Sequence, residues 1–292
     1  MTDQPRAERG VGHASGPERP VRLAPPRALT IAGSDSGGGA GLQADLRTFF
    51  ANGVHGMTAV TAVTVQNSVG VSDVAEIPPS VVAAQIRAVA TDIGVDAAKT
   101  GMLATTEIIM AIVAACDEVG IGASGTTPLV VDPVAASMHG DQLLRDEALE
   151  AYRTELLPRA TLVTPNLDEV RLLVGIDVTD ADEQRQAAKE LHALGARWVL
   201  VKGGHMHHDP TCTDLLYDGN DFTELTGPRF DTTHTHGGGD TLAASITAVL
   251  AKGASVPDAV AHGKRFIERS VQASYPLGAG VGPVSPFWVL DD

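Results

Sequence analysis

The densest group of chemically capable residues lies near the C-terminus, where three consecutive glycines, Gly237 to Gly239, precede Asp240. Small and apolar residues follow at helical spacing, which predicts a helix beginning at this point. Glycines let a backbone approach a ligand closely, and the free N–H groups and positive dipole end of a helix face the loop before it. The pattern therefore predicts an anion site with a carboxylate at its edge, which suits transfer of a phosphoryl group onto a hydroxyl.

A set of oxygen-bearing side chains occurs in the middle of the chain. Asp132 ends an apolar run, and Asn166 and Glu169 follow the next one. Mg²⁺ in proteins usually takes one or two carboxylates together with waters and substrate phosphates. Asn166 with Glu169 three residues later also matches a capping box at a helix start. Both interpretations stay open, because a helix cap and a magnesium site can use the same residues.

Two further strand ends carry groups suited to a ligand. Lys202, Gly203 and Gly204 follow an apolar run, and a lysine is a mobile point charge that suits nucleotide phosphates. Gln66 ends another run, and its carboxamide offers one acceptor and two donors. It could therefore read the edge of a heterocycle, although a turn residue explains the pattern equally well.

The glycine-rich segment 33–41 contains neither a Walker A motif nor GxGxxG. Its glycines serve either a ligand or a tight turn between a strand and a helix. Asp35 and Asp45 would accordingly position a polar substrate or act as surface caps.

The histidine-rich stretch 205–209 has poor spacing for zinc, so we interpret it as a polar loop. The absence of GxSxG disfavours a hydrolase with that nucleophile.

The elements that must position these residues alternate between strands and helices. Apolar runs predict strands, and segments of helical periodicity separate them. The alternation predicts an α/β fold with a mostly parallel central sheet and helices on both faces, in which ligands bind at the carboxyl ends of the strands. The predicted strands are 28–32, 57–65, 95–99, 129–132, 161–164 and 197–201 with a hairpin of 213–217 and 222–225; the predicted helices are 42–52, 78–93, 106–119, 141–157, 167–174, 180–194, one after Asp240, and 257–274.

Composition limits the class of protein. The 292 residues are 43% apolar and 20% charged, and a chain of this length buries roughly 75% of its unfolded surface. Two cysteines are too few for a disulfide framework and fit a reducing cytoplasm. The net charge of −15 argues against nucleic acid as a partner, and no apolar run approaches the ~18 residues of a membrane span. Residues 1–27 lack a secretory signal and are expected to be a disordered tail, which leaves 28–292 as one domain.

A series of longer motifs occurs along the chain in the order ALTIAGSDSGGGAGLQADLRTF, TAVTVQNS, KTGML, VVDPV, TPNLDE, VKGGH and HTHGGGDT. From about Ala28 onward the chain resembles the bacterial hydroxymethylpyrimidine/phosphomethylpyrimidine kinases of thiamine biosynthesis, in the ribokinase-like superfamily. The resemblance implies a ribokinase-like sheet with a small β extension, and a homodimer built from edge β-structure. It also implies a kinase that uses ATP and Mg²⁺ to phosphorylate 4-amino-5-hydroxymethyl-2-methylpyrimidine and then its monophosphate.

The resemblance also implies roles for single residues. Asp240 would be the catalytic base, and Gly237, Gly238 and Gly239 would form the anion hole. The remaining residues form three sets: Gln66, Gly33, Asp45, Met102 and Val134 for the pyrimidine; Lys202, Gly203, Gly204, Asn166 and Thr235 for the nucleotide; Asp132 and Glu169 for Mg²⁺.

The chain departs from the family pattern at two positions. Members commonly have GTGC or GTGD where this chain has GGGD, so Gly238 lacks a threonine hydroxyl. Asp240 stands where the best-known kinases for this substrate carry cysteine, whereas aspartate is the usual base in the wider superfamily, including pyridoxal kinases. Pyridoxal kinase, alone or as a second activity, therefore stays an alternative. A pyrimidine-binding protein with little catalysis is the other.

Overall fold

The backbone of the computed structural model, described for residues 24–123, 125–134, 146–204 and 211–291, is built on one sheet. Its nine strands have the order β3-β2-β1-β4-β5-β6-β7-β8-β9, and the six from β2 to β7 are parallel neighbours. The predicted α/β class with a mostly parallel sheet is confirmed. The parallel strands are β1 (Arg27–Ser34), β2 (His55–Gln66), β4 (Ala97–Thr100), β5 (Leu129–Val131), β6 (Leu162–Val163) and β7 (Trp198–Val201).

Antiparallel strands extend the sheet at both edges. β3 (Val71–Glu76) pairs with β2, while β8 (Thr211–Tyr217) pairs with β7 and β9 (Phe222–Pro228) pairs with β8. The hairpin of β8 and β9 was predicted, but β3 was missed. Its sequence, VSDVAE, is short and polar, and its side chains are exposed or half-buried. It is a strand because β2 offers it a partner, which no local pattern reveals.

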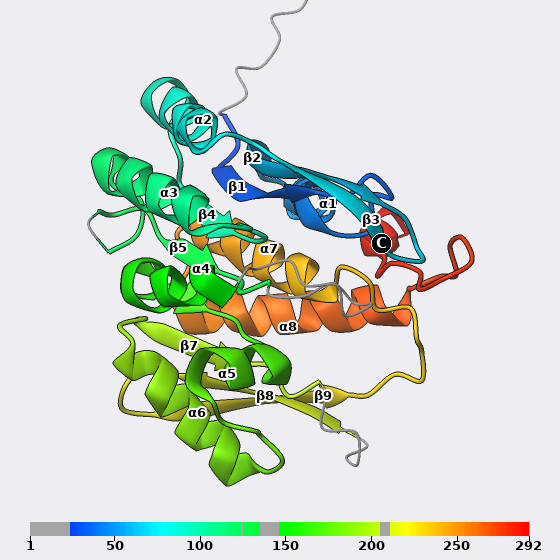
Figure 1. Cartoon of the computed structure of the whole chain (residues 1–292). Coiled ribbons are helices and arrows are strands. Elements are labelled where there is room, and N and C mark those ends of the chain that lie inside the picture. Colours follow the sequence, from blue (N-terminus) through cyan, green and yellow to red (C-terminus); the bar gives the residue numbers. More distant parts are fainter. Residues whose placement is uncertain (1–23, 124, 135–145, 205–210, 292) are drawn as a thin grey trace, which may run out of the picture.

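Helices cover both faces of the sheet (Figure 1). In the strand β5, Leu129 and Val131 pack into the larger apolar cluster with one set of helices, and Val130 packs into a second cluster with α7 and α8. This alternation explains why β5 is apolar throughout. The first set is α2 (Pro79–Asp92), α3 (Thr106–Val119), α4 (Asp146–Ala151), α5 (Leu167–Val174) and α6 (Ala181–Ala193); the opposite face carries α1 (Gly41–Ala51), α7 (Gly238–Ala251) and α8 (Val256–Gln272).

Most predicted helices are confirmed, and α3 and α5 have the predicted bounds. Within α1, Phe49 takes the buried position and the adjacent Phe50 is 79% exposed, although both are apolar residues in the predicted helix 42–52. Part of the helix predicted at 141–157 lies outside the described residues. After Ala151 it continues as a π turn over Tyr152–Leu156 and a 3₁₀ turn over Leu157–Arg159. Within the described ranges, no helix is long and apolar enough to cross a membrane.

Candidate active site

The carboxyl ends of the parallel strands meet at one edge of the sheet, as predicted. Backbone hydrogen bonds connect the residues that leave each strand: Gly101 N–H donates to Ile31 (3.0 Å), Asp132 N–H to Thr100 (3.1 Å), Thr164 N–H to Val131 (3.0 Å) and Lys202 N–H to Pro165 (2.9 Å). The polar residues selected from the sequence therefore sit on neighbouring strand ends.

The N-terminus of α7 closes this edge. Gly237 is the N-cap at φ +72°, and Gly238 begins the helix, so Asp240 lies in its first turn. A Cβ on Gly237 would collide with the carbonyl oxygen of Gly39, and a Cβ on Gly39 would collide with the ring of His236. The two glycine-rich segments are thus packed backbone against backbone. This contact requires glycine at both positions.

Asp35 holds the first glycine-rich loop together. Its two oxygens accept hydrogen bonds from the N–H groups of Gly37, Gly39 and Ala40, each at 2.8 Å, and His236 Nε2 lies 3.1 Å from Oδ2. Burial alone would raise the pKa of Asp35, but the hydrogen bonds from His236 and the loop amides bring it below its ordinary value. Asp35 therefore shapes the loop, and His236 is a structural partner that sequence reasoning missed.

Asp240 shares a lysine with Asp45. Lys99 Nζ, from β4, lies 2.8 Å from Asp45 Oδ1 and 3.5 Å from Asp240 Oδ1. Asp45 Oδ2 accepts a hydrogen bond from Thr30 at 2.6 Å. The Asp45 side chain is 0% exposed, so it lies beneath the cleft surface, with both oxygens engaged. In the sequence Lys99 is only the last residue of the predicted strand 95–99, because nothing local distinguishes it.

The predicted metal ligands converge on one cation position. Lys202 Nζ lies 3.2 Å from Asp132 Oδ1 and 3.8 Å from Glu169 Oε2. Burial, opposed by Lys202, raises the pKa of Glu169 to about 8. Gly239 leaves space beside this group, since a Cβ there would lie 3.4 Å from Lys202 Nζ and 3.6 Å from Asp132 Oδ2. Two carboxylates already arranged around a cation, next to free space, fit Mg²⁺. Among the residues that the structure describes, no group of three His, Cys, Asp or Glu side chains could hold a metal alone.

Asn166 and Glu169 form the predicted capping box at the start of α5. Asn166 Oδ1 accepts the Glu169 N–H at 2.9 Å, and Glu169 Oε2 accepts the Asn166 N–H at 2.7 Å. The helix-cap interpretation is therefore confirmed. It leaves Glu169 Oε2 facing Lys202 as well, so the cap also fixes one of the two carboxylates at the cation position.

The predicted pyrimidine residues lie mainly over β1, β2 and β4. A Cβ on Gly33 would be 3.2 Å from Met102 Sδ, so glycine there leaves the methionine in place. Gln66 is fixed by its neighbours: its N–H donates to Ser36 Oγ at 2.9 Å, and Thr64 Oγ1 donates to its side-chain oxygen at 3.1 Å. Val134 lies two residues beyond Asp132 and donates its N–H to the Asp132 carbonyl at 2.9 Å.

The backbone after β7 is held by residues that the sequence did not single out. Gly203 donates its N–H to Asp214 Oδ1 at 2.8 Å, and Arg229 donates to the Gly204 carbonyl at 2.7 Å. Thr235 contributes its carbonyl oxygen, which accepts the Gly238 N–H at 3.1 Å. The histidine-rich stretch 205–209 lies outside the described residues.

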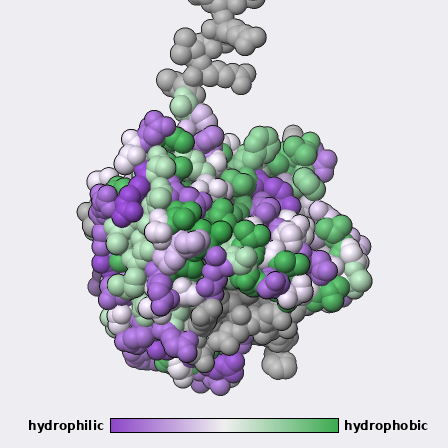
Figure 2. Space-filling view, turned by 45° about the horizontal axis from the view of Figure 1, so that its top comes forward, coloured by the Kyte–Doolittle hydropathy of each residue, from purple (hydrophilic) through white to green (hydrophobic). Residues whose placement is uncertain are grey.

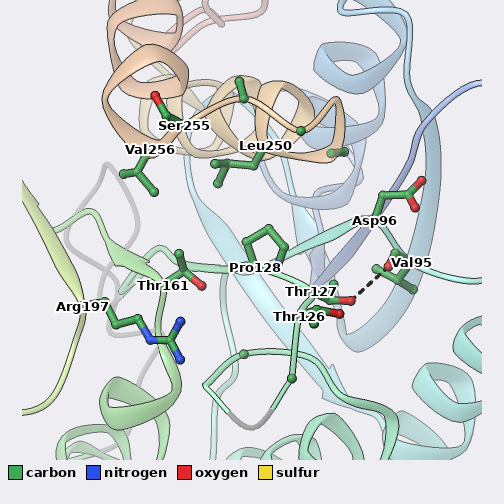
Figure 3. A pocket seen from close by; sticks show the side chains of 15 residues that line it. Val95, Asp96, Thr126, Thr127, Pro128, Thr161, Arg197, Leu250, Ser255 and Val256 are labelled. Carbon is green, nitrogen blue, oxygen red and sulfur yellow. Dashed lines mark hydrogen bonds between the residues drawn. The ribbon is translucent and has the colours of Figure 1, made fainter.

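A hollow of about 560 Å³ lies at the opposite edge of the sheet (Figure 3). Asp96, Pro128, Thr161 and Arg197, which precede β4, β5, β6 and β7, line one side, and Leu250 and Val256 line the other. None of the predicted site residues lines it. The candidate chemistry is therefore confined to the carboxyl edge.

Comparisons with known proteins show which families this chain is similar to. Residues 35–285 match the family model described as phosphomethylpyrimidine kinase. A hydroxymethylpyrimidine/phosphomethylpyrimidine kinase of Mycobacterium tuberculosis is 57% identical over 274 residues, 94% of this chain and 98% of the relative. The ADP complex of Bacillus subtilis pyridoxal kinase has a TM-score of 0.84 at 40% identity and covers 92% of this chain and 100% of that one. The structure of phosphomethylpyrimidine kinase from Clostridium difficile has a TM-score of 0.73 at 38% identity. The match covers 83% of this chain and 97% of that one.

Proposed function

Because the chain belongs to the phosphomethylpyrimidine kinase family, we propose that its carboxyl-edge site transfers the terminal phosphoryl group of ATP to a pyrimidine alcohol. The substrate is 4-amino-5-hydroxymethyl-2-methylpyrimidine, and its monophosphate is then converted to the diphosphate, in thiamine biosynthesis. The observation that carries the site assignment is the position of Asp240, in the first turn of α7 beside three glycines and within reach of Lys99.

Asp240 is the proposed base. It orients the hydroxymethyl oxygen toward the phosphorus and accepts its proton as the new P–O bond forms. A carboxylate is a weak base, but positioning and charge stabilisation supply most of the rate enhancement in phosphoryl transfer. In the first turn of α7 the Gly238 N–H donates to the Thr235 carbonyl at 3.1 Å, and the Gly239 N–H has no carbonyl four residues earlier within the helix. The Gly239 N–H and the positive end of the helix dipole are the proposed stabilisers of the developing negative charge, with Gly237 to Gly239 as the proposed anion hole.

The proposed nucleotide set adjoins the anion hole at Gly239, where a Cβ would lie 3.4 Å from Lys202 Nζ. Lys202 supplies a mobile positive charge for the phosphates, and Gly203, Gly204, Asn166 and Thr235 complete the proposed binding site. Asp132 and Glu169 would hold Mg²⁺, which supplies charge neutralisation at the transferred phosphoryl group. In this arrangement Lys202 leaves the two carboxylates when it turns toward the nucleotide.

The acceptor set lies over β1, β2 and β4. Gln66 pairs with the aminopyrimidine edge, while Gly33, Met102 and Val134 line the ring. Asp45 completes this set from beneath. A direct contact between Asp45 and the substrate would require its pair with Lys99 to open, since its side chain is fully buried.

Pyridoxal kinase activity is the second candidate, because the 0.84 TM-score neighbour is a pyridoxal kinase and pyridoxal also carries a primary hydroxymethyl group on an aromatic heterocycle. The ratio of kcat/KM for the pyrimidine and for pyridoxal, at fixed MgATP, decides between the two. A binding protein with little catalysis would release no ADP in response to either compound.

The decisive experiment measures ADP release that depends on the pyrimidine, in the wild type and in Asp240→Asn. We expect rapid release from the wild type and a loss of about 10²–10⁴-fold in the variant, with unchanged thermal unfolding. Near-normal turnover by Asp240→Asn would contradict the role of Asp240. Absence of turnover in the wild type would contradict the kinase assignment itself.

We also propose that the protein is a cytoplasmic homodimer. Figure 2 shows hydrophobic residues gathered among polar ones on one face of the molecule. The exposed apolar residues include Val63 and Val65 on β2 and Val69 in the turn to β3, which are 46%, 57% and 60% exposed. An exposed apolar strand near a sheet edge favours association with a second chain. Sedimentation of Val65→Lys should shift toward monomer, whereas Val81→Lys on α2 should not.

A further inference from the structure

Lys99 is a fully buried cation that no step of the proposed reaction uses. Its side chain is 0% exposed and points from β4 between α1 and α7, 2.8 Å from Asp45 Oδ1 and 3.5 Å from Asp240 Oδ1. A buried ammonium group is retained only where charges compensate it. Here one of the compensating carboxylates belongs to the proposed base.

The two carboxylates around Lys99 are held differently. Asp45 is fixed at both oxygens, by Lys99 and by Thr30, and cannot turn toward the cleft without losing a contact. Asp240 has Oδ1 on Lys99 and a side chain that is 13% exposed. Its Oδ2 is therefore the oxygen that the side chain can offer to an acceptor hydroxyl.

We propose that Lys99 is a positioning residue for Asp240: its ammonium group, held in place by Asp45 and Thr30, fixes Asp240 Oδ1 so that Oδ2 faces the acceptor hydroxyl. The proposal rests on the proposed function, because it takes Asp240 as the base. Gly101 adjoins the same pair: a Cβ there would lie 3.1 Å from the Ala32 Cβ, 3.7 Å from Lys99 Nζ and 3.9 Å from Asp240 Oδ1.

The carboxylates around Lys99 keep its side chain protonated. Burial alone would lower the pKa of Lys99, but the carboxylates of Asp45, Asp240 and Asp132 raise it above its ordinary value. Lys99 therefore stays protonated at neutral pH. Burial raises the pKa of Asp45 to about 7 against the lowering effect of Lys99. When Asp240 accepts a proton from the substrate, Asp45 is the remaining carboxyl group beside the ammonium group, at 2.8 Å.

The test separates positioning from folding with a double-mutant cycle. Lys99→Met alone leaves Asp45 uncompensated and can fail to fold, so the decisive protein is Asp45→Asn/Lys99→Met, which keeps a polar partner for Thr30. We expect its thermal unfolding to return toward that of the wild type, while kcat stays about 10–100-fold below that of Asp45→Asn, the single variant that carries any effect of Asp45 on the substrate. A misplaced reacting group commonly has an effect of this size. The dissociation constant for ADP should change less than twofold. The matched control is Lys252→Met at the far, exposed end of α7, which should keep wild-type kcat.

A second cycle asks whether Lys99 acts through Asp240. In an Asp240→Asn background, adding Asp45→Asn/Lys99→Met should lower the residual kcat less than threefold. A further loss of kcat by about 10–100-fold in the Asp240→Asn background would overturn the proposal. So would a wild-type kcat in Asp45→Asn/Lys99→Met. Both outcomes differ from failure of the kinase assignment, in which the wild type itself would release no ADP with the pyrimidine.

Discussion

Asp214 accepts a hydrogen bond of 2.8 Å from the backbone N–H of Gly203, and so it joins the hairpin of β8 and β9 to the proposed nucleotide loop. Its other oxygen lies 3.0 Å from Lys264 Nζ, which also donates to the Cys212 carbonyl at 3.0 Å. Lys264 and Asp214 are only 9% and 7% exposed at their side chains. A buried pair from α8 and β8 therefore sets the backbone of a loop from β7.

Lys264→Met should lower the free energy of unfolding by about 3–5 kcal/mol, because it leaves the Asp214 carboxylate buried without a cation. Asp214→Asn/Lys264→Met should recover most of that loss, since an amide oxygen can still accept the Gly203 N–H. Urea unfolding measures both. Arg87→Met, which removes an exposed pair with Glu118, should change stability by only about 0.5 kcal/mol. A double variant as unstable as the single one would contradict this interpretation.

Lys202→Met should weaken ADP binding about 10–100-fold, because it removes a charge-assisted contact to the phosphates worth about 1.5–3 kcal/mol. The KM for the pyrimidine should stay within about twofold of the wild type, since the acceptor set does not contact Lys202. Calorimetric titration with ADP and steady-state kinetics check the two quantities separately. An equal rise in the dissociation constant for ADP and in the KM for the pyrimidine would mean instead that Lys202 maintains the structure of the whole carboxyl edge.

Alanine substitutions of the three glycines before Asp240 should have different effects on stability and activity. Gly238→Ala should fold and keep most activity, because its Cβ would meet only Val284 and Ile267, at 3.8 and 3.9 Å. Gly237→Ala should lose about 2 kcal/mol or more of stability, through its φ of +72° and the collision with Gly39. Gly239→Ala should fold but lose activity, because its Cβ would enter the space beside Lys202 and Asp132.

Thermal unfolding and pyrimidine-dependent ADP release, measured on all three variants, check this order. A Gly238→Ala protein as damaged as Gly237→Ala would contradict it. The same measurements on Gly238→Thr show whether the family threonine can be restored, because a Cβ at that position would make only ordinary van der Waals contacts with Val284 and Ile267.

Because the thiol of Cys116 is buried, we expect the free energy of unfolding to fall at alkaline pH. Burial raises the pKa of its thiol to about 12, above the ordinary value near 8.5. A group with a raised folded pKa contributes stability below its unfolded pKa, and that stability is lost as the pH rises toward the folded value. The advantage of the wild type over Cys116→Ala should therefore shrink by about 1.4 kcal/mol per pH unit above pH 8.5. Urea unfolding from pH 7.5 to 10.5 measures it, and a constant difference would show that the thiol does not titrate in this way.

The order of helices and strands was predictable because it follows from the local periodicity of apolar residues. The bounds of α3 and α5 agree with prediction, and the Asn166–Glu169 capping box was identified from three-residue spacing. The strand β3 was not predictable, because its polar residues become a strand only by pairing with β2. Adjacent Phe49 and Phe50 compete for one buried position, and the packing of α1 against α7 decided between them.

By itself, the sequence determined the α/β class, the edge of the sheet that carries the site, and the residues Asp240, Lys202, Asp132 and Glu169 as candidates for its chemistry. These features follow from local patterns and from the rule that parallel strands end at one edge. The tertiary structure alone decided which charges meet. Lys99 is an ordinary strand residue until α1 and α7 bring Asp45 and Asp240 to it, from 54 residues before it and 141 after it. Contacts over such separations depend on the packed core, and no local pattern encodes them.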